Sequence, residues 1–319
     1  MRVLITGATG FAGRHLSRRC ISAGHEVDAL VRQGREDAVE PGARPHVADL
    51  ADPGQVAAVL RAARPDGIVH LAGASSVGRS FADPLGTWHV NLGGTLSVLE
   101  ALRTEAPGTP TLIVTSGEIH GLVPVETLPV TADTPLHPVS PYGASKAAAD
   151  LAAGQYRAAH GVAAIRVRAF NHIGPGQDPR FVLPNVARQI ARAEREGRDR
   201  VEVSVGNLDT RRDFVDVRDM VRAYLLLLER GEPDTVYLAC GGRSTAVREI
   251  VEGLVPLARI PVTFTSREGL RREGEQPDLY GSPERLRADT GWSPEIPLET
   301  TLADTLDHWR ERVARDDEE

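Results

Sequence analysis

A glycine-rich turn near the amino terminus constrains the fold of this chain more than any other feature. An apolar segment at 2–6 leads into Gly7-Ala8-Thr9-Gly10-Phe11-Ala12-Gly13, and a helix-length amphipathic segment follows. In such a turn Gly7 makes the tight bend, Gly10 lets the backbone approach a pyrophosphate, and Gly13 lets the helix pack closely on the strand. The helix start offers free N–H groups and the positive end of its dipole to phosphate. The turn therefore predicts a dinucleotide-binding site, with a purely structural turn as the less favoured alternative.

Apolar runs of strand length alternate with helix-length amphipathic segments through the first half of the chain. The runs are nearly continuous, as expected for strands of a parallel sheet buried on both faces. This order predicts an α/β fold with a doubly wound parallel sheet of the Rossmann type and right-handed crossovers. Strands are expected at 2–6, 26–31, 45–48, 66–71, 111–115 and 163–168, and helices at 12–23, 53–63, 85–103 and 141–160.

The alternation loosens from about Ala169, where proline and glycine become frequent. Helices are expected near 181–195, 217–229, 247–257 and 298–313, and a strand at 201–205. We therefore predict a dinucleotide-binding domain over residues 1–168, to which residues 211–242 return. Residues 169–210 and 243–319 are expected to form a smaller C-terminal substrate-binding lobe.

Composition limits the classes of protein to which this chain can belong. Of its 319 residues, 41% are hydrophobic and 25% charged, which is ordinary for a globular protein. The formal net charge is −7 and no block is strongly basic, so we expect no nucleic-acid partner. No apolar run is long enough to cross a membrane, and the chain starts on a strand rather than an export signal. Two distant cysteines, Cys20 and Cys240, indicate a reducing compartment and no cysteine metal site, so we expect a cytoplasmic protein.

The end of the second expected strand bears on the choice of cofactor. An acidic residue there would hold the adenosine ribose of NAD, but the sequence places Arg32 there, with Arg35 close by. These arginines could face a 2′-phosphate, so NADP(H) is favoured and NAD(H) stays possible; alternatively, both are solvated loop charges. The expected cofactor contacts are Gly7, Gly10, Phe11, Ala12, Gly13, Arg32, Arg35, Asp49, Leu50, Leu71, Ala72, Gly73, Tyr142, Lys146 and Phe170.

Tyr142 and Lys146 lie four residues apart, directly after Ser140-Pro141, a pair typical of a helix start. At that spacing both side chains project from one helical face. Lys146 is the only lysine among 37 cationic residues; all the others are arginine. Its ammonium would favour the phenolate and lower the pKa of Tyr142 from about 10 toward neutrality. We therefore expect Tyr142 to exchange a proton with a substrate oxygen, the alternative being a surface pair without a catalytic role.

The fifth expected strand ends at Ser116-Gly117-Glu118-Ile119-His120, where strand ends of such sheets face the ligand crevice. Ser116 could hydrogen-bond the same reacting oxygen as Tyr142. Glu118 is a carboxyl group that could serve as general acid or base at a sugar carbon. His120 is expected to be structural. The catalytic candidates are therefore Ser116, Glu118, Tyr142 and Lys146.

This set of residues resembles the extended short-chain dehydrogenase/reductases, which modify nucleotide-activated sugars. The resemblance rests on Gly7, Gly10, Gly13, Asp49, Ser116, Tyr142 and Lys146. Residues 168–177 and 206–214 resemble the GDP-mannose branch, with 170–177 closer to the GDP-4-keto-6-deoxy-mannose reductases than to the 4,6-dehydratases. The resemblance implies that substrate is bound by Ser75, Asn171, Val182, Asn207, Arg212, Arg272 and Glu275. Arg212 would hold the diphosphate, the alternative being an ion pair with Asp213 or Asp216.

By resemblance, the expected reaction is the reduction of a GDP-4-keto-6-deoxyhexose at C4, with hydride from the nicotinamide and a proton from Tyr142. A 4,6-dehydratase or 4-epimerase that borrows and returns the hydride stays open, because Glu118 is present in this chain. A cofactor-binding sensor without turnover is the alternative of another class, and a sensor has no use for an activated phenol. The family also pairs the helices expected at 85–103 and 141–160 with those of a second subunit, which implies a homodimer.

Overall fold

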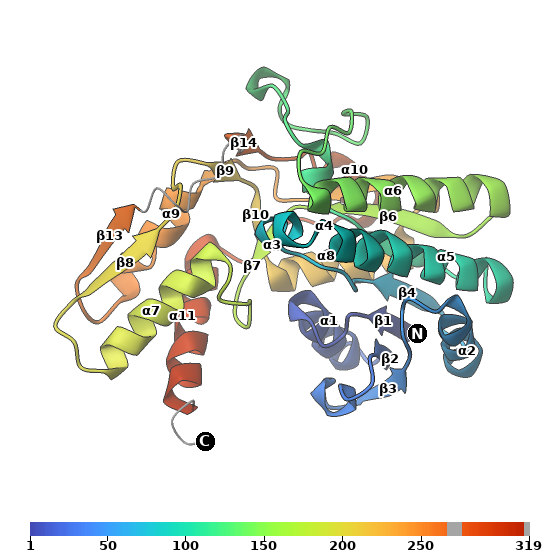
Figure 1. The fold of residues 1–319 in the computed structure, drawn as a ribbon, viewed down its shortest axis with the longest axis horizontal. Helices are drawn as coiled ribbons and strands as arrows, with labels where there is room; N and C mark the ends of the chain where they lie inside the picture. The colour runs from blue at the N-terminus through green and yellow to red at the C-terminus, as the bar shows by residue number, and fades with distance from the viewer. Residues whose placement is uncertain (267–275, 316–319) are drawn as a thin grey trace.

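The computed structural model describes residues 1–266 and 276–315. Seven parallel strands form one sheet in the order β11-β6-β5-β4-β1-β2-β3 (Figure 1). This arrangement confirms the expected doubly wound sheet. The strands are β1 (Arg2–Thr6), β2 (Glu26–Val31), β3 (Ala43–Val47), β4 (Gly67–His70), β5 (Thr111–Val114), β6 (Ala164–Ala169) and β11 (Val236–Ala239).

Helices cover both faces of this sheet because successive strand residues point to opposite sides. Val3 and Ile5 of β1 belong to the core beneath α1 and α8, whereas Leu4 belongs to the core beneath α2, α5 and α6. The sheet is therefore buried on both faces, which explains why its strands read as continuous apolar runs. These helices are α1 (Phe11–Ser22), α2 (Pro53–Ala63), α5 (Gly94–Glu105), α6 (Pro141–His160) and α8 (Val217–Arg230).

The helix expected at 85–103 is interrupted in the structure. It consists of α4 (Pro84–Trp88), a π-helical turn (His89–Gly93) and α5, and a short α3 (Val77–Ala82) precedes it. The wider turn places Asn91 inside, where its amide binds both the N–H and the carbonyl oxygen of Ala74. Such turns often lie at functional sites, and periodicity alone does not signal them.

A second core forms the C-terminal lobe, on the left of Figure 1. Its helices α7 (Val182–Arg195) and α11 (Leu298–Arg315) pack together, and β8 (Val201–Val205) pairs in parallel with β13 (Val262–Ser266). The helix expected at 247–257 was too long. It ends at Glu252 as α9 (Val247–Glu252), and a 3-10 turn (Val255–Leu257) follows Gly253.

Two small sheets lie between the main sheet and this lobe. One contains β9 (Arg211–Arg212), β12 (Thr245–Ala246) and β14 (Asp278–Leu279), and the other pairs β7 (Asn171–Ile173) with β10 (Phe214–Asp216). None of these short strands was expected from the sequence. The remaining elements are α10 (Glu284–Thr290) and the 3-10 turns at Glu36–Ala38, Gly117–His120 and Val125–Thr127.

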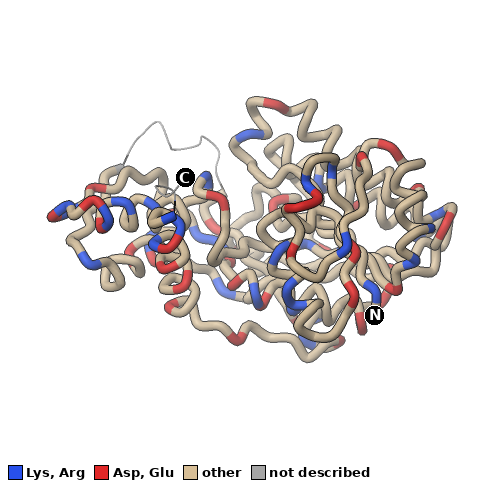
Figure 2. The backbone as a smooth tube through the Cα atoms, turned by 90° about the horizontal axis from the view of Figure 1, so that it is seen from below, with Lys and Arg blue, Asp and Glu red and all other residues tan. Residues whose placement is uncertain are grey.

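Basic and acidic residues are interspersed along both parts of the molecule (Figure 2). Cys20 and Cys240 are both buried and unpaired. Within residues 1–266 and 276–315, no helix has the length and apolarity needed to cross a membrane. The same residues contain no histidine, cysteine or carboxylate cluster suited to a metal ion.

Candidate active site

The carboxyl ends of the parallel strands gather most of the expected site residues along one edge of the sheet. The glycine turn follows β1, Arg32 and Arg35 follow β2, and Asp49 and Leu50 follow β3. Leu71, Ala72 and Gly73 follow β4, Ser116 and Glu118 follow β5, and Phe170 follows β6. Tyr142 and Lys146 reach the same edge from the first two turns of α6.

The glycine turn leaves no room for side chains. Gly7 has a φ of 73°, and a Cβ on it would lie 2.8 Å from the backbone nitrogen of Ala72. A Cβ on Gly13 would lie 2.1 Å from the carbonyl oxygen of Gly7. Gly10 is the N-cap of α1 in extended conformation, and it has no side chain to cover the first N–H groups of the helix. The backbone thus forms an open cradle with free donors, which fits a pyrophosphate.

The side chains expected around the adenosine all lie at the surface. Arg32, Arg35 and Asp49 are exposed and Leu50 is half-buried. Neither arginine forms an ion pair with any part of the chain that the structure describes. Asp49 accepts a hydrogen bond from the backbone of Ala51 at 2.9 Å. Both guanidinium groups are therefore available to an anionic ligand.

Tyr142 is buried, and the expectation that its pKa is lowered is wrong for this structure. Burial raises the pKa of Tyr142 to about 12, against a lowering effect of its side-chain hydrogen bond with Ser116, and Glu118 raises it further. The reason is that burial disfavours a phenolate. The helical face is shared as expected, but the Lys146 ammonium donates to the carbonyl oxygen of Val114 at 3.0 Å. A phenol that stays protonated is suited to giving a proton.

Lys146 is buried next to the segment that follows β4. A Cβ on Gly73 would lie 3.3 Å from Lys146 Nζ and 2.8 Å from Asn91 Oδ1. Burial lowers the pKa of Lys146 to about 8, because water no longer stabilises the ammonium. A glycine at 73 therefore avoids a side chain that would press on Asn91 and Lys146.

Arg212 approaches Glu118, one of the catalytic candidates. Its Nε lies 3.9 Å from Glu118 Oε1, and its Nη1 donates to the carbonyl oxygens of Arg211 and Gln276, both at 2.8 Å. Glu118 is therefore placed between Arg212 and Tyr142, whose pKa it influences.

The two carboxylates next to Arg212 in the sequence are bound elsewhere. Asp213 accepts from the backbone N–H groups of Gly241 and Gly242, and Asp216 pairs with Arg218. The described residues therefore give no support for an ion pair between Arg212 and either Asp213 or Asp216.

The other expected substrate residues are spread more widely. Ser75 and Asn171 are exposed near the strand ends, Val182 begins α7, and Asn207 follows β8. Arg272 and Glu275 lie outside the described residues.

Sequence reasoning missed two buried amides that organise the site. Asn91 holds Ala74 and donates to Ser145 Oγ at 2.9 Å, and its only signal is a polar residue within the apolar stripe of 85–103. Gln276 binds the backbone of Val123 through both amide atoms, while its own carbonyl oxygen accepts from Arg212. For Gln276 the sequence carries no signal of these contacts, because Val123 and Arg212 are more than 60 residues away from it.

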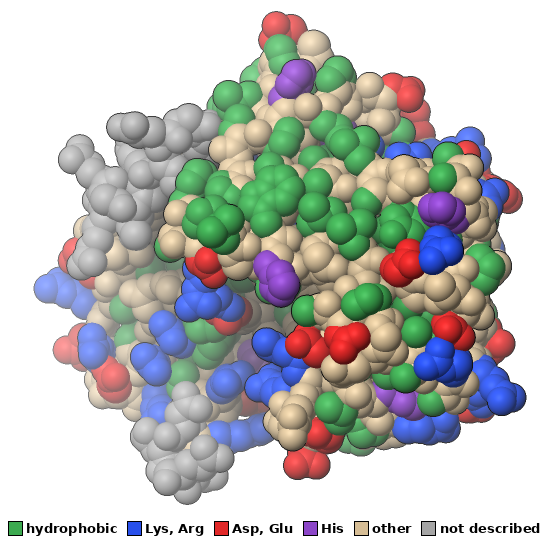
Figure 3. Space-filling model, turned by 45° about the vertical axis from the view of Figure 1, so that its right-hand side comes forward, with side chains coloured by type: hydrophobic (Ala, Val, Ile, Leu, Met, Phe, Trp, Pro, Cys, Tyr) green, Lys and Arg blue, Asp and Glu red, His purple; other side chains and the backbone are tan. Residues whose placement is uncertain are grey.

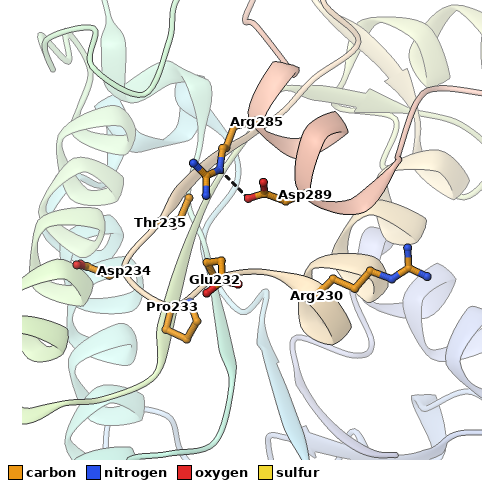
Figure 4. A pocket seen from close by; sticks show the side chains of 7 residues that line it. All are labelled: Arg230, Glu232, Pro233, Asp234, Thr235, Arg285 and Asp289. Atoms are coloured by element: carbon orange, nitrogen blue, oxygen red, sulfur yellow. Dashed lines mark hydrogen bonds and ion pairs between the residues drawn. The ribbon is translucent and has the colours of Figure 1, made fainter.

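A surface hollow of about 650 Å³ lies at the opposite edge of the sheet, next to the amino end of β11 (Figure 4). Within it Arg285 pairs with Asp289 at 2.6 Å. Its lining residues include none of those described above. They are Arg230, Glu232, Pro233, Asp234, Thr235, Arg285 and Asp289.

Comparisons with known proteins agree with this geometry. Residues 4–305 match the model of a family described as GDP-mannose 4,6 dehydratase. The chain is 37% identical over 312 residues to GDP-6-deoxy-D-mannose reductase of Pseudomonas aeruginosa, covering 98% of both chains. The solved structure of RMD from Pseudomonas aeruginosa complexed with NADPH is similar, with a TM-score of 0.85, 36% identity, and 98% of this chain and 99% of that chain covered. The UDP-glucose 4-epimerase of Thermus thermophilus in complex with NAD has a TM-score of 0.83 and 30% identity, with 97% and 99% covered. The expected resemblance is confirmed, and the chain belongs to the GDP-mannose 4,6-dehydratase family of nucleotide-sugar enzymes.

Proposed function

We propose that this protein reduces the 4-keto group of a GDP-4-keto-6-deoxyhexose, using NADPH. The observation that carries the proposal is the buried, protonated Tyr142, hydrogen-bonded to Ser116 at the edge of the sheet that bears the glycine turn. The similarity to GDP-6-deoxy-D-mannose reductase of Pseudomonas aeruginosa supports this choice of reaction. We place the reaction in the cytoplasm, consistent with two unpaired cysteines.

The residues present fit a dinucleotide. The glycine turn would receive the pyrophosphate, since a Cβ on Gly7 or Gly13 would fill that space. Arg32 and Arg35 would face a 2′-phosphate, which favours NADP(H) over NAD(H). When bound, the nicotinamide supplies the hydride that reduces the sugar carbonyl carbon.

The chain's own residues act on the carbonyl oxygen. Ser116 and Tyr142 orient it by hydrogen bonding, and Tyr142 gives its hydroxyl proton as negative charge develops on that oxygen. Lys146 would hold the nicotinamide ribose, because its ammonium lies beside Gly73. The raised pKa of Tyr142 suits this direction of proton transfer.

The substrate would lie between Tyr142 and the short strands next to the lobe. Arg212 presents a guanidinium suited to a diphosphate, and it is buried with its Nη1 fixed by two carbonyl oxygens. Asn171 in β7, paired in register with Phe214 of β10, would contribute a neighbouring polar contact. We accordingly propose that residues 169–210 and 243–319 form the substrate lobe and that 211–242 belong to the dinucleotide domain.

The second candidate function is a 4,6-dehydratase or 4-epimerase. Glu118 supports this second function. Its carboxylate lies 3.9 Å from Arg212 and raises the pKa of Tyr142, so it is placed where it could reach a proton of the sugar ring. A sensor without turnover has no comparable support, since it requires neither Tyr142 nor Glu118.

Cofactor stoichiometry separates these functions. The purified protein is incubated with GDP-mannose alone, and then with GDP-4-keto-6-deoxymannose plus NADPH. We expect no conversion in the first reaction. In the second reaction we expect one NADPH to be oxidised per sugar reduced, at a rate that Tyr142→Phe lowers about 1,000-fold. Conversion of GDP-mannose without added NADPH would support the dehydratase instead. Absence of any turnover with either sugar would favour the sensor.

We also propose that two copies associate through a helical apolar face. This face comprises Phe81, Leu85, Val90, Leu96 and Leu151, which are exposed on α3, α4, the π-turn, α5 and α6. Figure 3 shows hydrophobic side chains gathered on this side of the molecule. An apolar patch of this kind is typical of a protein–protein contact.

Sedimentation velocity tests the dimer. Leu85 and Leu151 are 81% and 61% exposed, so replacing both with aspartate should give monomers without unfolding the chain. Val47→Asp is the matched control, because Val47 is 49% exposed on β3, away from this face. A wild-type protein that sediments as a monomer at micromolar concentration would refute the dimer.

A further inference from the structure

A chain of buried hydrogen bonds runs beneath the segment that follows β4. Thr6 Oγ1 lies 2.7 Å from His70 Nδ1, and His70 Nε2 lies 3.1 Å from Thr95 Oγ1. Thr95 Oγ1 donates to the carbonyl oxygen of Asn91 at 2.7 Å, and Asn91 Nδ2 donates to Ser145 Oγ on the catalytic helix at 2.9 Å. The chain therefore joins β1, β4, α5 and α6, and all of its side chains are buried.

The same chain holds the backbone of the 71–74 segment at two points. The N–H of Ala72 donates to Thr6 Oγ1 at 3.2 Å, and the N–H of Ala74 donates to Asn91 Oδ1 at 2.8 Å. Between these points, Gly73 lies against Asn91 and Lys146. The segment thus lies between the glycine turn and the catalytic helix, and its position depends on both ends of the chain.

The donors and acceptors fix the tautomer of His70. The hydrogen of Thr95 Oγ1 is committed to Asn91, because an O···O distance of 2.7 Å without a hydrogen would be repulsive. Thr95 Oγ1 must then accept from His70, which puts the imidazole hydrogen on Nε2. His70 Nδ1 is left as an acceptor for the hydroxyl of Thr6, whose lone pair in turn accepts from Ala72.

We propose that His70 is a positioning residue, held as the neutral Nε2–H tautomer, that fixes the 71–74 segment against Lys146 for cofactor binding. This inference rests on the proposed function only because it takes NADPH as the cofactor that the 71–74 segment helps to bind. Burial and the nearby Lys146 charge lower the pKa of His70 to about 3, so the ring stays neutral under working conditions. Protonation would give Nδ1 a hydrogen and require the Thr6 hydroxyl to turn away from it.

Nitrogen NMR of the full-length chain tests the tautomer directly. Histidine is labelled with ¹⁵N, and His70 is assigned by the signal lost in His70→Gln. We expect the His70 signals to report a neutral Nε2–H ring from pH 5.5 to 8, with and without NADPH. A protonated ring or an Nδ1–H tautomer in this range would overturn the proposal.

A pair of threonine variants tests the positioning role. Thr95→Val removes the acceptor of His70 Nε2–H, whereas Thr111→Val removes an equally buried hydroxyl that bonds only Thr109. We expect Thr95→Val to shift His70 toward the Nδ1–H tautomer and to weaken NADPH binding about tenfold by calorimetry. Thr111→Val should change neither the tautomer of His70 nor the affinity for NADPH. Equal NADPH affinities and unchanged tautomers in the two variants would overturn the proposal.

These readouts separate the inference from the function on which it rests. A wild-type protein that binds NADPH but fails to reduce the keto sugar would refute the reductase and leave the His70 result to be judged on the threonine pair. A wild-type protein that does not bind NADPH would refute both.

Discussion

Most of the expected cofactor contacts follow successive strands of one parallel sheet, whereas the expected substrate residues Asn171 and Arg212 lie on β7 and β9, which belong to different small sheets. On the cofactor side, the glycine turn is built from seven consecutive residues, and its tightest approach, that of Gly13 to the carbonyl oxygen of Gly7, lies within them. On the substrate side, Arg212 is fixed by Gln276 and faces Glu118, residues 64 and 94 positions away. Short motifs thus determine one side, and long-range contacts determine the other.

Removing the phenol should have the largest effect, because both sides of the site meet at Tyr142. We expect Tyr142→Phe to lower kcat about 1,000-fold, since the proton donor is lost. NADPH affinity and thermal stability should change little, because the ring remains. Steady-state NADPH oxidation with the keto sugar and calorimetry with NADPH measure the two quantities. Full activity in this variant would contradict the assigned proton donor.

A methyl group in the glycine turn should disable the cofactor side. The Cβ of Gly13→Ala would lie 2.1 Å from the carbonyl oxygen of Gly7, so helix and strand must separate. We expect NADPH binding to be lost and the free energy of unfolding to fall by about 1–3 kcal/mol. Gly108→Ala is the control, since among the described residues only those adjacent in the chain would lie within 4 Å of its Cβ. Normal NADPH binding by Gly13→Ala would contradict the close-packed turn.

Changing Arg212 to lysine should affect the substrate side alone. A lysine keeps the charge but cannot bind Gln276 and a diphosphate with separate N–H groups. We expect KM for the nucleotide sugar to rise about 10–100-fold while the Kd of NADPH stays unchanged. If KM for the nucleotide sugar and the Kd of NADPH rose by the same factor, the two sides would not be independent.

The pH dependence of kcat/KM should reveal the titration of Lys146. With a pKa of about 8 in the folded protein, its ammonium is lost as pH rises through that value, so we expect kcat/KM to fall about tenfold per pH unit above it. The free energy of unfolding should change in the opposite direction and rise with pH. The unfolded chain, with a lysine pKa of 10.5, binds more protons between pH 8 and 10.5, so the free energy of unfolding gains from rising pH in that window. Lys146→Met should be slow and should lack this limb of the rate profile.

The smallest effect is expected at the surface of the cofactor side. Arg32 and Arg35 are exposed, so solvent screens their attraction for a 2′-phosphate. We expect the Arg32→Ala, Arg35→Ala double variant to lose about tenfold in NADPH affinity and nothing in NADH affinity. Calorimetric titration with each dinucleotide measures this. A loss that is equal for both would show that the arginines contact a part that the cofactors share.

Short-range signals along the chain were enough to predict several elements of its first half. The boundaries of β1, β2, α2 and α6 coincide with the expected ranges, because apolar runs, Asp52-Pro53 and Ser140-Pro141 mark them locally. The position of the glycine turn after the first strand and of Ser116 after the fifth also placed both at one sheet edge, since parallel strands all end there.

Properties that depend on neighbours distant in the sequence could be established only from the folded chain. The pKa of Tyr142 is raised because the assembled core excludes water from the phenol, whatever its spacing from Lys146. The π-turn at Asn91, the strand that carries Arg212 and the hydrogen-bond chain through His70 each need partners from separate elements. Periodicity reports which face of an element is buried, but it does not report which polar group will meet which.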